Sequence, residues 1–219
     1  MSNISLDYII DEVVKRIKSQ MLIEVEASGR HIHLSDEHLQ ILFGSGYTLT
    51  KVKDLSQPGQ YACKERVTIT GPKGAIKNVI VLGPTRKETQ VEVSLTDALS
   101  LGIKIPVRES GHIENTPGLI VSTERGAITL NKGLIVAKRH IHITPEDAEK
   151  FGVKDKENVK VEVLGERPLI FEDTVIRVSP NFRTYMHIDY DEANACGFAK
   201  GTMCKIGRAS CRERVSSPV

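Results

Sequence analysis

The sequence contains no tryptophan, only five phenylalanines and only four cysteines. The shortage of large aromatic side chains argues against a platform on which nucleic-acid bases could stack. Cys63, Cys196, Cys204 and Cys211 show no Cys-x-x-Cys spacing, so neither a thiolate zinc site nor a disulfide framework is indicated. We therefore expect a reducing, cytoplasmic setting.

Charge and hydropathy argue against two further classes of partner. A formal net charge of +2 over 219 residues provides no electrostatic basis for binding nucleic acid or an anionic membrane. The sequence has no apolar run of about 18 residues and no recognisable secretory signal, so we expect no membrane span. A composition that is 40% hydrophobic and 26% charged is typical of a globular chain that buries a real core.

What the sequence does contain is an Arg-His-Ile-His tetrapeptide at residues 30–33 and again at residues 139–142. In an extended strand, side chains two positions apart share a face and lie roughly 6–7 Å apart. Each pair can therefore bind one divalent ion, at about 2.0–2.1 Å per imidazole. The paired histidines are His31 with His33 and His140 with His142.

Each tetrapeptide is followed by the signals of a short helix. Ser35 and Thr144 are suitable N-cap residues, and acidic residues follow them where the helix dipole favours negative charge. Gly44 and Gly152 stand where each helix should end. We expect each His-x-His strand to run directly into a capped helix.

A second repeated unit emerges when Glu92 is aligned with His187. A polar cap and a helix pattern follow both residues, and a segment with a proline and an arginine precedes both, at residues 83–86 and 179–183. The chain thus has the pattern of an internal duplication with two ligand-bearing units in each half. Duplication alone needs no metal, but it does not explain why the aligned positions hold five histidines and a glutamate.

Most of the remaining sequence predicts short β-strands rich in β-branched residues. They lie at residues 67–70, 78–82, 127–130, 134–137, 159–163 and 174–178. Turn residues separate them, and no long crossover helix connects them, which favours small barrels over a parallel α/β sheet. We expect a mainly β fold of two small β-barrel domains, capped by short α-helices.

The two ends of the chain differ from the rest. Apolar residues at helical spacing over residues 4–18 predict an amphipathic helix within an N-terminal segment, residues 1–20. Two interpretations stay open: it packs on its own domain or a sister subunit, or it docks on a shell protein. Residues 206–219 resemble the in-frame translation of a sequencing-library adapter, and we expect a non-native tail there.

Taken together and in order, these motifs resemble those of the PduL-type phosphate acyltransferases, the phosphate propanoyltransferase family, over residues 21–205. The resemblance implies two apposed β-barrels, two zinc ions per chain, and acyl transfer between coenzyme A and phosphate. It also implies an interleaved order. Residues 21–43 with 138–205, including the first His-x-His strand, would form the first barrel, and residues 44–137 the second.

The resemblance further implies a role for particular residues. One zinc would be held by His31, His33 and Glu92, and the other by His140, His142 and His187, with Glu92 available as a bridge. Arg86 falls on the phosphate-binding arginine of the family, and its counterpart in the duplication, Arg183, is a weaker phosphate candidate. Arg86 and Glu92 are therefore the candidate catalytic residues.

The implied reaction converts a short-chain acyl-CoA, propanoyl-CoA or acetyl-CoA, and phosphate into acyl phosphate and coenzyme A. The resemblance also suggests propanediol degradation inside a bacterial microcompartment, and a homo-oligomer is compatible with it. Two alternatives remain, a dizinc thioester hydrolase and a non-catalytic module in which zinc holds the barrels together. Arg86 favours the transferase, because thioester hydrolysis requires no bound phosphate.

Overall fold

The computed structural model describes Ile10, Val13 and residues 21–207 of the chain. Apart from Ile10 and Val13, the predicted N-terminal helix lies outside the described residues, as does the tail beyond residue 207. Docking of the N-terminal segment on a sister subunit or a shell protein therefore stays a prediction. Among the described residues, no helix is both long and apolar enough to cross a membrane.

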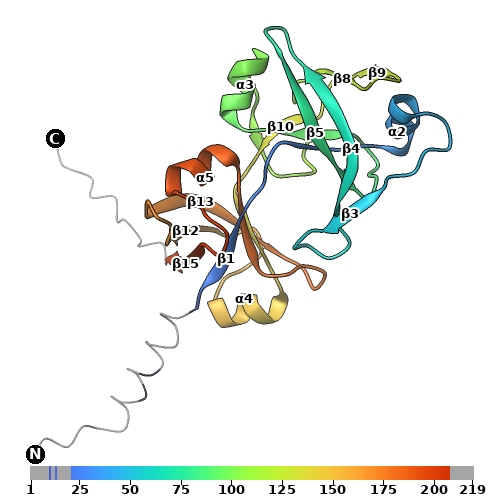
Figure 1. Ribbon diagram of the computed structural model, residues 1–219. Helices are drawn as coiled ribbons and strands as arrows, with labels where there is room; N and C mark the ends of the chain where they lie inside the picture. The colour runs from blue at the N-terminus through green and yellow to red at the C-terminus, as the bar shows by residue number, and fades with distance from the viewer. Residues whose placement is uncertain (1–9, 11–12, 14–20, 208–219) are drawn as a thin grey trace, which may run out of the picture.

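One unit of the structure is a closed barrel of six strands (Figure 1). In barrel order these are β1 (Ile23–Ala27), β14 (Tyr185–Ile188), β11 (His140–Ile143), β13 (Leu169–Val178), β12 (Asn158–Val163) and β15 (Met203–Gly207). Alternation of apolar and polar residues along β12 directs its valines inward, and Val161, Ile176 and Met186 are completely buried in the barrel core. Closure leaves no edge strand in this unit.

The other unit is a curled sheet of nine strands. Its order is β7 (Val107–Arg108), β10 (Leu134–Ala137), β6 (Gln90–Glu92), β2 (His31–His33), β5 (Ala75–Gly83), β4 (Tyr61–Thr70), β8 (Ile120–Ser122) and β9 (Ala127–Thr129), with β3 (Lys51–Asp54) paired to β4. Ile32, Val91 and Leu134 are fully buried within its core. The predicted mainly β fold is confirmed, although strand pairing closes only one of the two units into a barrel.

We had expected the first His-x-His strand to join the barrel of the C-terminal half, but it does not. Strand β2 pairs in parallel with β5 and antiparallel with β6, and only β1 of this segment lies in the closed barrel. In the other half, β11 likewise pairs in parallel with β13 and antiparallel with β14. The two units therefore repeat one pairing scheme, and each His-x-His strand stays with the third ligand strand of its own half.

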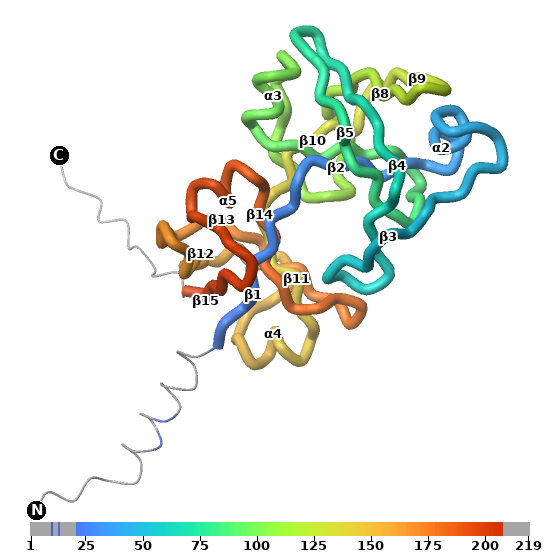
Figure 2. Tube along the Cα trace, in the orientation of Figure 1, coloured from blue at the N-terminus to red at the C-terminus, as the bar shows by residue number. Residues whose placement is uncertain are grey.

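What the two halves exchange is the strand before each His-x-His strand. Strand β1 pairs in parallel with β14 in the barrel, and the chain then passes to β2 in the sheet (Figure 2). Strand β10 pairs in parallel with β6 in the sheet, and the chain then returns to β11 in the barrel. Interleaving thus brings both His-x-His strands to the region where the two units meet, and the pairing favours a division near residue 28 rather than residue 44.

Within residues 21–207, four short helices cover the ends of the two units (Figure 1). They are α2 (Asp36–Phe43), α3 (Leu95–Leu101), α4 (Pro145–Phe151) and α5 (Tyr190–Cys196). The predicted N-caps are confirmed, since the side chains of Ser35 and Thr144 accept hydrogen bonds from the third residue of α2 and of α4. Ser94 and Asp189 begin α3 and α5, and each forms a reciprocal capping box.

The last strand extends further than the sequence indicated. We had assigned Ile206 and Gly207 to the tail, but both belong to β15, where Ile206 pairs with Val161 and Gly207 with Lys160 of β12. Pairing with a central barrel strand gives these two positions a place in the fold that the local sequence pattern does not reveal.

Candidate metal centre and active site

The first group of metal-capable side chains spans two neighbouring strands of the sheet. His31 on β2 lies directly opposite Glu92 on β6, and His33 follows on the same face of β2. One nitrogen or oxygen atom from each residue lies within 4.8 Å of the other two. His31 Nε2 lies 3.4 Å from Glu92 Oε2. We call His31, His33 and Glu92 the first trio.

The second group repeats this arrangement in the barrel. His140 on β11 lies directly opposite His187 on β14, and His142 follows two positions later. Their ligand-capable nitrogens also lie within 4.8 Å of one another, and the ring centroids of His140 and His142 are 4.5 Å apart. His140, His142 and His187 form the second trio. Its geometry follows from the same strand register as the first, since β11 and β14 repeat the pairing of β2 and β6.

In each trio a backbone carbonyl orients the first histidine. Nδ1 of His31 lies 2.8 Å from the Gly29 carbonyl, and Nδ1 of His140 lies 2.8 Å from the Lys138 carbonyl. Because a carbonyl oxygen only accepts, each Nδ1 carries the hydrogen that it donates. In the neutral ring the lone pair is then on Nε2, which in His31 is the atom that faces Glu92.

The second histidine of each pair bears an unsatisfied nitrogen. Nδ1 of His33 and Nδ1 of His142 are buried and have no hydrogen-bond partner among the residues that the structure describes. A buried polar atom without a partner costs about 1–3 kcal/mol, so such atoms are uncommon. A divalent cation would satisfy them, and three histidines or two histidines with a carboxylate are ligand sets that zinc accepts. The donors of both trios therefore fit zinc.

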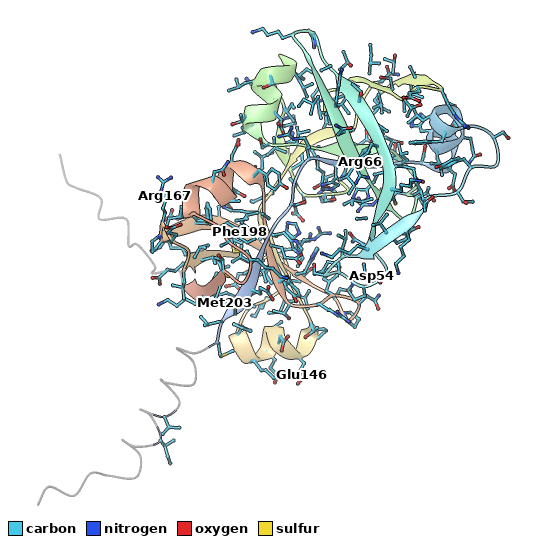
Figure 3. The ribbon with its side chains drawn as sticks, viewed as in Figure 1. Asp54, Arg66, Glu146, Arg167, Phe198 and Met203 are labelled. Atoms are coloured by element: carbon cyan, nitrogen blue, oxygen red, sulfur yellow. The ribbon has the colours of Figure 1, made fainter. Side chains whose placement is uncertain are left out.

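Both trios line one cavity of about 660 Å³ between the two units. Arg86 and Arg177 also line it, as does Arg66 of β4, which is labelled in Figure 3. Arg183 is not among the lining residues; its backbone N–H and carbonyl bond the side chain of Gln57. Of the two arginines predicted to bind phosphate, Arg86 lies in the cavity with the trios and Arg183 does not. Arg177 lies beside Arg86 instead.

Known proteins share this chain's sequence over nearly its whole length. The family model described as phosphate propanoyltransferase matches residues 24–199. The chain belongs to the phosphate propanoyltransferase family. Proteins named phosphate propanoyltransferase from Clostridioides difficile and Enterococcus faecalis are 67% and 62% identical to it, over 92% and 90% of this chain and 96% and 94% of their own. One from Thermotoga maritima is 55% identical, over 90% of this chain and 94% of its own.

Membership of the phosphate propanoyltransferase family makes the chain an acyltransferase. The histidines of the second trio have the protonation state that metal binding would require. Burial lowers the pKa of His140 to about 4, that of His142 to about 2 and that of His187 to about 3. For His142 and His187, the neighbouring His140 adds to the effect of burial. All three rings are therefore neutral at pH 7 and can donate a lone pair.

The first trio contains an ionised carboxylate. Burial alone would raise the pKa of Glu92, but His31, His33 and Ser110 together hold it well below its usual range. Burial works against the charged form of His31 too, yet the charge of Glu92 and its hydrogen bond raise the pKa of His31 above the ordinary value. Burial lowers the pKa of His33 strongly. With His31 deprotonated, as a metal ligand must be, the first trio would offer a cation one formal negative charge.

Two further side chains hold Glu92 in place, and the sequence analysis missed both. Gln90 Nε2 and Ser110 Oγ donate hydrogen bonds of 2.6 and 2.8 Å to Glu92 Oε1, which leaves Oε2 facing His31. Gln90 was identifiable in principle, because it stands two residues before Glu92 on the same strand face. Ser110 is 18 positions away in a loop, and nothing in its local sequence marks it.

Arg177 and Gln57 were also missed. Arg177 lies on β13 opposite His142, and a lone arginine in the otherwise apolar run Val175–Val178 was a usable signal. Gln57, in the loop between β3 and β4, is only 4% exposed, and its Nε2 lies 3.4 Å from His187 Nε2. That contact joins residues 130 positions apart, so only the tertiary structure reveals it.

Proposed function

We propose that this chain interconverts a short-chain acyl-CoA and phosphate with acyl phosphate and coenzyme A, by direct attack of phosphate beside two zinc ions. The observation that carries the proposal is the opening of both trios, together with Arg86 and Arg177, into one cavity. Propanoyl-CoA is the proposed substrate, in keeping with the family, and acetyl-CoA is the alternative. The two acyl groups differ by one methylene, which a pocket discriminates by only about 1–3 kcal/mol.

Each zinc would have three protein ligands, His31, His33 and Glu92 for one, and His140, His142 and His187 for the other. Three protein ligands leave a coordination position for substrate, as in catalytic rather than structural zinc sites. When bound, the ions would offset the charge of phosphate, stabilise the oxyanion that develops at the thioester carbonyl, and favour departure of the thiolate. Glu92 is a candidate bridge, but its Oε1 would first have to exchange its two hydrogen bonds for a cation.

Arg86 would hold the attacking phosphate. Its backbone N–H donates to the Leu34 carbonyl at 2.9 Å, and its Nη1 donates to Ser110 Oγ at 3.4 Å, so the residue is tethered at both ends. Guanidinium can form two parallel hydrogen bonds to phosphate, a geometry that lysine cannot reproduce. With Arg177 near it, two positive side chains face a nucleophile that carries about two negative charges.

The transfer needs no covalent acyl-enzyme. A phosphate oxygen forms the bond to the thioester carbon, the carbon–sulfur bond breaks, and the thiolate of coenzyme A leaves with the electron pair. Cys63 and Cys204 are buried, which raises the pKa of their thiols to about 11 and about 12. Ser28 Oγ lies 3.5 Å from His31 Nδ1, but that nitrogen already carries a hydrogen, so it cannot accept the serine proton.

A thiol-release assay with propanoyl-CoA tests the proposal. We expect purified, zinc-loaded protein to release free thiol only when phosphate is present, and to form an acyl phosphate that hydroxylamine traps in equal amount. Release at the same rate without phosphate would identify a thioester hydrolase instead. Tightly bound zinc with no acyl-CoA activity under either condition would identify a structural zinc module.

Substitution of Arg86 by alanine should impair phosphate use without removing metal. Hydrogen bonds to a charged group contribute about 1.5–3 kcal/mol, so we expect a roughly 10- to 100-fold lower kcat/KM for phosphate, with an unchanged KM for acyl-CoA. Zinc content should stay at the wild-type value, because Arg86 is not a ligand. Arg125→Ala removes an exposed arginine that bonds the Phe43 carbonyl at the end of α2 and should leave both constants unchanged. Loss of zinc in Arg86→Ala would contradict the role given to this residue.

A further inference from the structure

The arginine that opens each Arg-His-Ile-His tetrapeptide makes the same kind of contact in both halves. Arg30 Nη2 lies 3.2 Å from Asp97 Oδ1, and Arg139 Nη1 lies 2.7 Å from Glu192 Oε1. Asp97 is the third residue of α3, and Glu192 is the third residue of α5. In each half, therefore, the residue before the His-x-His pair is bound to the helix that follows the third member of the same trio.

The carboxylates that receive these arginines also cap their helices. Asp97 Oδ2 accepts a hydrogen bond from the Ser94 backbone N–H at 3.3 Å, and Glu192 Oε2 accepts one from the Asp189 backbone N–H at 3.0 Å. One oxygen thus fixes the first turn of the helix, and the other receives the guanidinium. Because Ser94 lies just two positions after Glu92, and Asp189 two positions after His187, the capped turn sets where the third ligand stands.

The strand register shows what the ion pair adds. His31 lies opposite Glu92, and His140 lies opposite His187, so the backbone ladder already brings each first histidine to its third ligand. The arginine adjoins the first histidine in sequence, and its acidic partner lies five positions beyond the third ligand in both halves. Each ion pair is therefore a second link between the same two strands. Side chains form it at the point where the backbone hydrogen bonds between the strands end and the helix begins.

We propose that Arg30 and Arg139 are positioning residues, each of which holds the third ligand of its own trio in register with the His-x-His pair. The inference rests on the zinc sites of the proposed function. Zinc–ligand distances vary by only about 0.2 Å. We therefore expect loss of either ion pair to lower the affinity for zinc more than it lowers the stability of the fold. Partners outside the ligand shell commonly change metal affinity by about 10- to 100-fold.

Arg139 provides the cleaner test of the two. Its Nε and Nη2 also donate to the Glu172 carbonyl, at 2.9 and 2.6 Å, and it does not line the cavity. Arg30 does line the cavity, and its side chain is 41% exposed, so its loss could also change substrate binding. An effect of Arg139 on the metal cannot arise from a lost contact with substrate in the cavity.

The test compares zinc affinity in wild-type protein, Arg139→Gln and Glu192→Gln by stepwise zinc release to a coloured chelator. Gln at position 192 keeps an oxygen that can accept the Asp189 N–H but removes the charge that pairs with Arg139. We expect about 10- to 100-fold weaker binding of one zinc ion in each variant, and no further loss in the double variant beyond that of Arg139→Gln, since both substitutions remove the contact between Arg139 and Glu192. The second ion should keep its wild-type affinity. With cobalt substituted for zinc, the absorption spectrum of one site alone should change.

Controls separate this inference from the others. Arg125→Gln removes an arginine that also bonds a helix end, at α2, away from both trios, and should release both ions as the wild type does. Wild-type zinc affinity in a folded Arg139→Gln protein, or equal weakening of both ions, would overturn the positioning role while leaving the zinc sites intact. Wild-type protein that binds no zinc would overturn the zinc sites, and this inference with them. Should Arg139→Gln fail to fold, Arg30→Gln and Asp97→Asn make the same comparison in the first trio.

Discussion

Replacing His140 by alanine is expected to remove one zinc ion and nearly all acyltransferase activity. The second trio would retain only two of its three metal-capable side chains. A bound divalent ion supplies several kcal/mol of charge stabilisation in the transition state, and each 1.4 kcal/mol is a factor of ten in rate. We therefore expect activity to fall by at least about 10³-fold. Metal analysis should show one equivalent of zinc in place of two.

The matched control for this substitution is His112→Ala. His112 is exposed and belongs to neither trio, so this variant should keep both zinc ions and its activity. Circular dichroism should show both variants folded, because the barrel core around Ile141 and Ile176 is untouched. Retention of two tightly bound zinc ions in His140→Ala would exclude His140 as a ligand. Zinc loss with full activity would exclude a catalytic role for that ion.

Replacing Glu92 by glutamine should have an effect of similar size, and its metal content distinguishes two roles. Glu92 supplies the formal negative charge of the first trio, so the neutral amide is expected to weaken zinc there and to lower activity by about 10³-fold. If Glu92 bridges the two ions, both should be lost. Loss of the first ion alone would refute the bridge and keep Glu92 as a ligand of one zinc.

Two companion variants make the result on Glu92 specific. Glu88→Gln changes an exposed glutamate that pairs with Lys132 on the surface, and should alter neither metal content nor rate. Ser110→Ala removes one of the two donors to Glu92 Oε1 and leaves the carboxylate in place. An intermediate loss of activity with both ions retained is expected from Ser110→Ala. Unchanged zinc content and rate in Glu92→Gln would exclude Glu92 from the site.

The strands were predictable because their signal is local. The predicted segments 78–82, 134–137 and 159–163 fall within β5, β10 and β12. β-Branched residues that alternate in burial identify a strand from a few neighbours alone. The helix caps at Ser35 and Thr144 were predictable for the same reason, since the bond that each makes reaches only three residues along the chain. The partner of each strand was not predictable, because strand register depends on residues that lie far away in sequence.

The residues of the candidate site were likewise only partly predictable from the sequence. The family resemblance implied that His31, His33 and Glu92 form one set, and the structure brings these three together, as it does the second trio. Zinc binding itself stays a prediction of the proposed function. Arg183 was chosen by its place in the duplication, but the cavity receives Arg177, which has no counterpart at the aligned position of the first half.

The sequence by itself determined the mainly β class and the helix caps, because each depends on backbone structure within a few residues. It also revealed the duplication and the six metal-capable side chains, because the same motifs recur along the chain. The tertiary structure alone decided that β1 and β10 exchange between the units, while each His-x-His strand stays in its own half. It also decided that Arg177 faces the cavity. These outcomes depend on which surfaces remain to be buried once both sheets have formed, and that balance involves the whole chain at once.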